Sequence, residues 1–170
     1  MLAQFESPAA AVRAHEELFG YWAGLKQQRA QAAAGLPGRP DIHPSHFKRH
    51  LPAVSLIDVR RTAGGRDYRL RLAGTDLYGV YGQEITGKGL ADVFRGEAEA
   101  YWRTELDKVV ETKKPAAGVH SLSWRGAEHL SILWLRLPLA SDGRRVDMIL
   151  GYDALIGGAG LRAASGIRAA

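Results

Sequence analysis

The chain has 170 residues, of which 46% are hydrophobic and 24% are charged, and it contains no cysteine. These values are typical of one ordinary globular domain, and they exclude disulfides, thiolate–metal sites and flavin–cysteine photochemistry. The formal net charge is +5, but the basic residues are scattered along the chain. We interpret them as a solvated surface and expect no nucleic-acid partner.

The first predicted element is a long amphipathic helix over residues 8–34, with Pro8 in its first turn. The residues of its apolar face recur at spacings near 3, 4 and 7, and they are Val12, Leu18, Phe19, Trp22 and Leu25. A proline- and glycine-rich breaker at residues 36–40 precedes a short helix expected over 41–50. No apolar run is long enough to span a membrane, and the amino terminus lacks the pattern of a secretory signal. We therefore expect a cytoplasmic protein.

Alternating apolar residues predict five strands, which cover residues 54–60, 67–73, 117–124, 130–139 and 146–152. The first two strands form a hairpin. A short helix capped by Thr75 and a longer helix over residues 96–112 lie between the second and third strands. Antiparallel strands with helices gathered between them predict an α+β fold. From residue 156 onward the sequence has no periodicity, and we expect a loose tail.

The middle of the chain resembles a bacterial, alphaproteobacterial-type subfamily of stand-alone PAS-like proteins. The segment Tyr68–Thr75, followed by Tyr81-Gly82 and Thr86-Gly87, carries most of this resemblance. Weaker matches are Tyr21-Trp22, Arg39–Ile42, Leu51-Pro52, Leu137–Leu139 and Ile149–Gly151. The resemblance implies a PAS-like five-stranded antiparallel sheet, with helices packed on one face over a small pocket. We expect a helical extension over residues 1–40, the PAS-like domain over 41–155 and the tail over 156–170.

PAS domains sense small ligands or dock other proteins, and they often form dimers. The resemblance therefore implies a sensory module for signal transduction: a homodimer with a protein partner that the sequence does not identify, a possible small-molecule ligand and no catalytic residues. The sequence names no cofactor and predicts no metal site. Two alternatives stay open, namely a ligand-free scaffold for protein–protein interaction and a small enzyme that acts on an acidic metabolite. The enzyme would require His120 or His129 in the same pocket as Arg71.

The predicted ligand-binding residues are Arg71, Tyr78, Tyr81, Leu133, Leu135 and Met148. Arg71 has the forked donors that clamp a carboxylate or phosphate, and its structural alternative is a salt bridge to Asp58 or Glu84. The two tyrosines are three residues apart on a short helix, so we expect them on one face, lining the cavity or packing on the sheet. The other face of the sheet, with Trp134 and Arg136, is expected under the first helix or at a dimer surface.

Overall fold

The structure is a computed structural model that describes residues 6–157. The helices are α1 (Pro8–Gln31), α2 (Leu77–Tyr81), α3 (Leu90–Val93) and α4 (Glu97–Thr112), with 3-10 helices at Arg39–Asp41, Pro44–Ala53 and Ser123–Arg125. The strands are β1 (Val54–Thr62), β2 (Gly65–Ala73), β3 (Ala116–Leu122), β4 (Ala127–Leu139) and β5 (Met148–Gly157). Within the described residues, no helix is long and apolar enough to cross a membrane.

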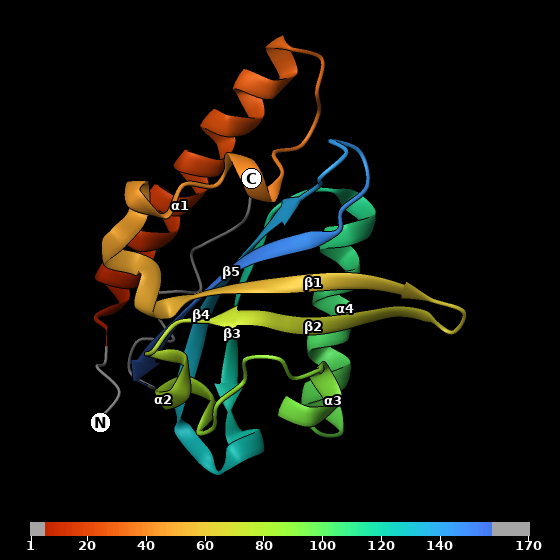
Figure 1. Ribbon diagram of the computed structural model, residues 1–170. Coiled ribbons are helices and arrows are strands. Elements are labelled where there is room, and N and C mark those ends of the chain that lie inside the picture. Colours follow the sequence, from red (N-terminus) through yellow and green to blue (C-terminus); the bar gives the residue numbers. More distant parts are fainter. Residues whose placement is uncertain (1–5, 158–170) are drawn as a thin grey trace.

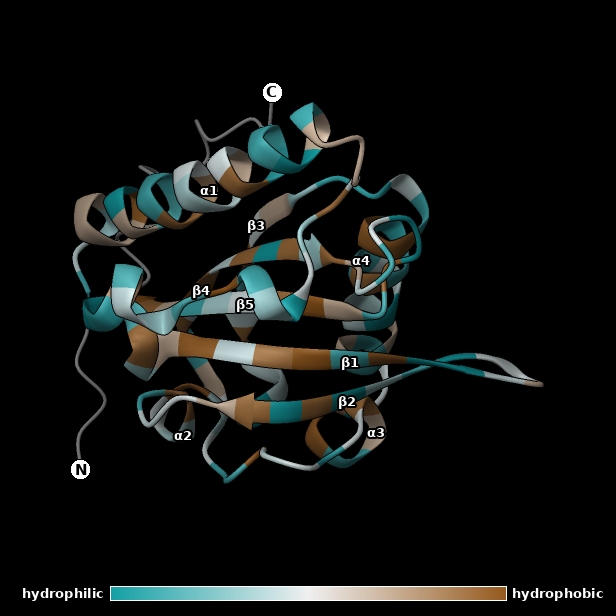
Figure 2. Ribbon diagram, turned by 45° about the horizontal axis from the view of Figure 1, so that its top comes forward, coloured by the Kyte–Doolittle hydropathy of each residue, from teal (hydrophilic) through white to brown (hydrophobic). Residues whose placement is uncertain are grey.

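The five strands form one antiparallel sheet in the order β2-β1-β5-β4-β3. Figures 1 and 2 show α1 across one face of this sheet and α2, α3 and α4 on the other side. The predicted α+β fold, its five-stranded antiparallel sheet and the long first helix are confirmed. Strand β5 runs to Gly157, so Ile156 belongs to the sheet and the predicted tail began too early. The rest of that tail lies outside the described residues.

Helix α1 is held against the sheet by a stripe of small and apolar residues. The buried positions are Ala11, Ala14, His15, Leu18 and Trp22, which recur every three or four residues. The indole Nε1 of Trp22 donates a hydrogen bond of 2.8 Å to the carbonyl oxygen of Pro138 on β4. The predicted apolar face was partly wrong, since Phe19 is 45% exposed.

The two faces of β4 and β5 are both buried, and their roles are the reverse of those expected. Leu135 pairs with Tyr152, and the Tyr152 ring packs edge-on against His15 of α1, with ring centroids 5.5 Å apart. Trp134, on the opposite face of β4, packs against Trp102 of α4, with ring centroids 5.4 Å apart. The leucine face of β4 therefore lies under α1, and the Trp134 face lies under α4.

A β-bulge breaks the alternation of β2. Leu72 pairs with Leu56 and Leu70 pairs with Ile57, so Arg71 is an extra residue between the two pairs. Leu70 stays buried, whereas Leu72 is 47% exposed. Strict alternation over the predicted strand 67–73 places Leu70 and Leu72 on one face, but the inserted residue changes which way the chain points beyond it, so the two leucines lie on opposite faces of the sheet.

Candidate functional site

A small cavity lies between the sheet and the helices α2, α3 and α4. Its volume is about 10 Å³, close to the space of one water molecule. Its apolar lining includes Ile57, Leu70, Leu90, Phe94 and Leu106. Three residues with polar groups, Tyr81, Trp102 and Arg136, also line it. The cavity is thus almost filled by side chains, with few polar atoms at its wall.

Arg136 and Asp153 form a buried ion pair at this cavity. Arg136 Nη2 lies 2.8 Å from Asp153 Oδ1, and their side chains are 3% and 1% exposed. Arg136 Nη1 donates to the carbonyl oxygens of Leu135 and Tyr152 at 2.9 and 3.3 Å. Tyr81 donates its hydroxyl proton to Asp153 Oδ2 at 3.0 Å, which joins α2 to β5.

The environment of this pair sets its charges. Burial by itself lowers the pKa of Arg136, but the negative charge of Asp153 and the hydrogen bonds outweigh burial, so the pKa lies above its ordinary value. Burial raises the pKa of Tyr81 well above its usual range, and the charge of Asp153 adds to this effect. At neutral pH Arg136 is therefore a guanidinium cation and Tyr81 a neutral phenol.

Two glycines make room for the large side chains of the site. Gly151 pairs with Arg136, and a Cβ atom at Gly151 would lie 3.2 Å from Arg136 Nη1 and 2.4 Å from Ser55 Oγ. Gly118 pairs with Trp134, and a Cβ atom there would lie 2.7 Å from the indole. Contacts this short leave no space for a methyl group, so glycine at these positions permits the arrangement.

Aromatic rings enclose the guanidinium of Arg136. Its Cζ atom lies 4.7 Å from the ring centroid of Trp102 and 5.7 Å from that of Trp134. The Trp134 N–H donates to the hydroxyl oxygen of Tyr101 at 3.0 Å. Phe94 stacks on Trp102 with ring centroids 5.7 Å apart. These cation–π and stacking contacts stabilise a buried cation away from water.

The roof of the cavity is fixed to the sheet by Arg125, which lies in the turn between β3 and β4. Arg125 Nη1 donates to the carbonyl oxygens of Gly79 and Val80 at 3.0 and 2.6 Å. Gly82, directly after α2, has a φ of +70°, in the left-handed region that favours glycine. Two short helices joined by loops therefore form this roof, and one arginine holds α2 in place.

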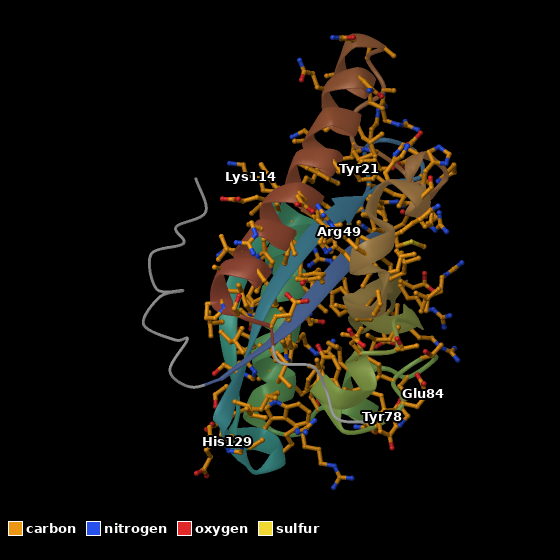
Figure 3. All side chains as sticks on the ribbon, turned by 90° about the vertical axis from the view of Figure 1, so that its left-hand side faces the viewer. Tyr21, Arg49, Tyr78, Glu84, Lys114 and His129 are labelled. Carbon is orange, nitrogen blue, oxygen red and sulfur yellow. The ribbon has the colours of Figure 1, made fainter. Side chains whose placement is uncertain are left out.

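The two candidate tyrosines point in different directions. Tyr81 is buried at the cavity, whereas Tyr78 is 61% exposed and lies on the outer side of the molecule (Figure 3). The buried stripe of α2 consists of Leu77, Val80 and Tyr81, which leaves Tyr78 on the solvent side. The expectation that the two rings share a face was wrong.

Leu133, Leu135 and Met148 are buried, but they lie away from the cavity. Met148 pairs with Leu139, which places it on the same face as Leu133 and Leu135. That face packs under α1. The sheet thus separates these three residues from Tyr81.

Arg71 forms its structural alternative, a salt bridge to Asp58 on the neighbouring strand. Its Nε lies 2.8 Å from Asp58 Oδ1, and its side chain is 60% exposed. His120 is on β3, at the opposite edge of the sheet, where its ring stacks on Tyr101 at 4.1 Å. His129 is exposed at the start of β4. The pocket of Arg71 with a histidine, which the enzyme alternative required, is therefore not formed by these residues.

We expect that replacing Arg71 with glutamine lowers the free energy of unfolding by less than about 1 kcal/mol, because exposed ion pairs contribute little. Urea unfolding followed by circular dichroism measures this difference. A loss above about 2 kcal/mol would contradict the prediction and would show that this pair is more than a solvated surface contact.

The family of the chain follows from comparison with known proteins. A profile described as "PAS domain" matches residues 10–154, which is most of the chain. The chain belongs to the PAS domain family. The match begins within α1, so it includes most of the helix that covers the second face of the sheet.

The chain is similar to solved structures of LOV proteins. A variant of RsLOV has a TM-score of 0.50 and 21% identity, with 71% of this chain and 70% of that chain covered. The Rhodobacter sphaeroides LOV protein has a TM-score of 0.47 and 19% identity, with 62% of this chain and 59% of that chain covered. At these identities the likeness concerns the fold alone. A comparison with curated proteins found no match.

Two residues of this site, Arg136 at the cavity wall and its partner Asp153, were not among the predicted ligand-binding residues. Each is a charged residue between apolar neighbours within a strand, in Leu135-Arg136-Leu137 and Tyr152-Asp153-Ala154. That pattern was available as a signal, because a charge in a strand buried on both faces requires a partner. The pairing itself depends on the register of β4 and β5, which places Asp153 two residues from the position opposite Arg136.

Proposed function

We propose that this PAS domain is a sensory module that binds a small molecule at the Arg136 cavity and passes the signal to a protein partner. The observation that carries this proposal is the buried Arg136–Asp153 pair beside the cavity, with Tyr81 of α2 hydrogen-bonded to it. Burying two charges is costly compared with apolar residues of similar size, so a buried pair is weak evidence for a purely stabilising role.

The proposed mechanism has two states. In the closed state α2 is held by Tyr81 on Asp153 and by Arg125 on the carbonyl oxygens of Gly79 and Val80. A ligand larger than one water molecule displaces the roof, and the binding free energy favours the open arrangement. A partner protein, which the residues of the chain do not identify, then distinguishes the two states. We propose a homodimer as the assembly.

A ligand-free scaffold is the second candidate function, and the cavity's small volume of about 10 Å³ favours it. In that case the aromatic and aliphatic side chains under the roof are simply core. Phe94, Trp102 and Leu106 are each at most 4% exposed, as core residues are.

Native mass spectrometry of the purified protein, repeated after denaturation, separates the two functions. We expect a stoichiometric extra mass on the native protein that disappears on unfolding, because a bound molecule is released when the cavity is lost. The same spectra report whether the protein is a dimer. A native mass equal to that of the bare chain would contradict the sensor and leave the scaffold.

A further inference from the structure

Two buried N–H donors at the Arg136 cavity have no acceptor. Arg136 and Trp102 are 2% and 1% exposed, and both line the cavity. Among residues 6–157, neither Arg136 Nε nor Trp102 Nε1 has a hydrogen-bond partner. Buried donors in folded proteins are nearly always paired, and exceptions call for an explanation. Eight buried side-chain polar atoms of the described residues have no partner, and two of them, Arg136 Nε and Trp102 Nε1, belong to residues that line this cavity. We take these two donors as the places where a bound molecule supplies an acceptor.

The charges at the cavity determine which acceptor fits. The guanidinium of Arg136 is already neutralised by Asp153 at 2.8 Å, and both side chains are buried. An anionic ligand would add a negative charge, and among the described residues no cation other than Arg136 lines the cavity to balance it. A buried charge without a partner is strongly unfavourable. A neutral acceptor, such as a carbonyl oxygen, satisfies the donors without this penalty.

The rest of the wall fits an apolar body. Beyond Tyr81, Trp102 and Arg136, the cavity is lined by aliphatic residues and Phe94. Tyr81 uses its hydroxyl proton on Asp153, so it offers no further donor. A ligand with several polar groups would therefore lose hydrogen bonds to water that this wall does not replace.

We propose that the Arg136 cavity binds a neutral, mainly apolar small molecule whose carbonyl-type oxygen accepts from Arg136 Nε, Trp102 Nε1 or both. This inference rests on the proposed function, in which the cavity is the ligand site, and it adds the chemical class of the ligand. Because the closed cavity has room for about one water molecule, the ligand binds with the roof of α2 and α3 displaced.

Three probes of nearly equal shape test the ligand class. Acetophenone has a neutral carbonyl, benzoate carries a charge at the same place, and α-methylstyrene has a CH₂ group instead of the oxygen. Each is titrated into the full chain while the side-chain N–H signals of Arg136 and Trp102 are followed by ¹H–¹⁵N NMR. We expect acetophenone to bind at least about fivefold more tightly than either other probe and to shift one or both signals, since one well-formed hydrogen bond contributes about that factor.

Two variants assign the preference to the donors. W102F keeps an aromatic ring but removes the unpaired N–H, and W134F removes an N–H that already donates to Tyr101 outside the cavity. We expect W102F to reduce the preference for acetophenone over α-methylstyrene if Trp102 Nε1 is the donor. If Arg136 Nε is the donor, W102F keeps the preference and acetophenone still shifts the Arg136 Nε signal. W134F is expected to leave the preference unchanged.

The proposal is overturned if benzoate binds as tightly as acetophenone, if α-methylstyrene does so, or if no probe shifts either side-chain signal. These outcomes are distinct from failure of the proposed function. A tightly held anion or polyhydroxylated molecule in the native mass spectrum overturns the ligand class while the sensor stands. A bare native mass, in contrast, counts against the sensor itself.

Discussion

Replacing Asp153 with asparagine is expected to lower the free energy of unfolding by about 3–5 kcal/mol, the range measured when one partner of a buried ion pair is removed. Asparagine keeps the shape of aspartate but leaves the charge of Arg136 without a counter-charge. Arg136 cannot relieve this by losing its proton, because an arginine stays protonated in proteins. The pair has little access to water, with side chains 3% and 1% exposed.

Urea unfolding followed by tryptophan fluorescence measures this loss, with R71Q as the matched control for an exposed pair. A third variant replaces the whole network with apolar residues, as R136M, D153L and Y81F together. We expect it to recover most of the loss, because apolar residues of similar volume often replace buried ion pairs without destabilisation. A loss below about 1 kcal/mol for D153N would contradict the prediction.

The apolar triple variant also bears on function. If it folds stably but binds acetophenone at least about fivefold more weakly, the ion pair is retained for binding or switching and not for stability. If it folds stably and binds the probe unchanged, the pair has no part in the ligand site. The expected result is the first, since the variant removes the Arg136 donor and its charge.

Acidification from pH 7 to pH 4 is expected to lower the stability by about 3 kcal/mol through His15 alone. Burial lowers the pKa of His15 from 6.5 to about 4; a hydrogen bond with the backbone of Leu133 opposes this shift, and the charge of Arg136 adds to it. Each pKa unit corresponds to about 1.4 kcal/mol. His15 is 6% exposed, so solvent screening is small.

The sign follows from proton binding. Below pH 6.5 the unfolded chain protonates His15, while the folded protein resists protonation until about pH 4. The unfolded state then holds more protons, so the stability falls as the pH falls through this window and levels off below it. Above pH 6.5 His15 is mostly neutral in both the folded and the unfolded state, so it causes almost no loss of stability there.

Comparison of the wild type with H15F isolates this contribution, because the carboxylates titrate in both proteins. We expect the free energy of unfolding of the wild type, relative to that of H15F, to fall by about 3 kcal/mol between pH 7 and pH 4. Urea unfolding of both proteins at the two pH values measures this change. H15Q serves as a second non-titrating variant in case phenylalanine does not fit beside Tyr152. Parallel pH profiles for the wild type and both variants would contradict the prediction.

The order of elements was predictable because each one has a local signal. The strict alternation of Leu133, Leu135, Leu137 and Leu139 predicts β4, and proline ends the helix before β3. The resemblance then predicted the five-stranded sheet and the PAS family of the chain. The PAS domain profile that matches residues 10–154 confirms this family. These features depend on residues that are close in sequence.

The candidate site was predictable only in part. Tyr81 was expected at the cavity and lies there, but Leu133, Leu135 and Met148 lie under α1. Alternation divides the side chains of a strand between two faces, yet it does not say which face a given helix covers. Since Ile132 and Trp134 are as buried as the leucines, hydrophobicity offered no way to choose.

By itself, the sequence determined the secondary structure, the α+β class, the family and the lack of cysteine chemistry, because these depend on composition and short-range pattern. Only the tertiary structure decided which face of the sheet holds the cavity and that Arg136 pairs with Asp153. It also decided that Arg71 lies outside the cavity, in a pair with Asp58. The physical reason is that these facts depend on strand register, on a bulge in β2 and on space left by glycines on adjacent strands. None of these is encoded by residues that are neighbours along the chain.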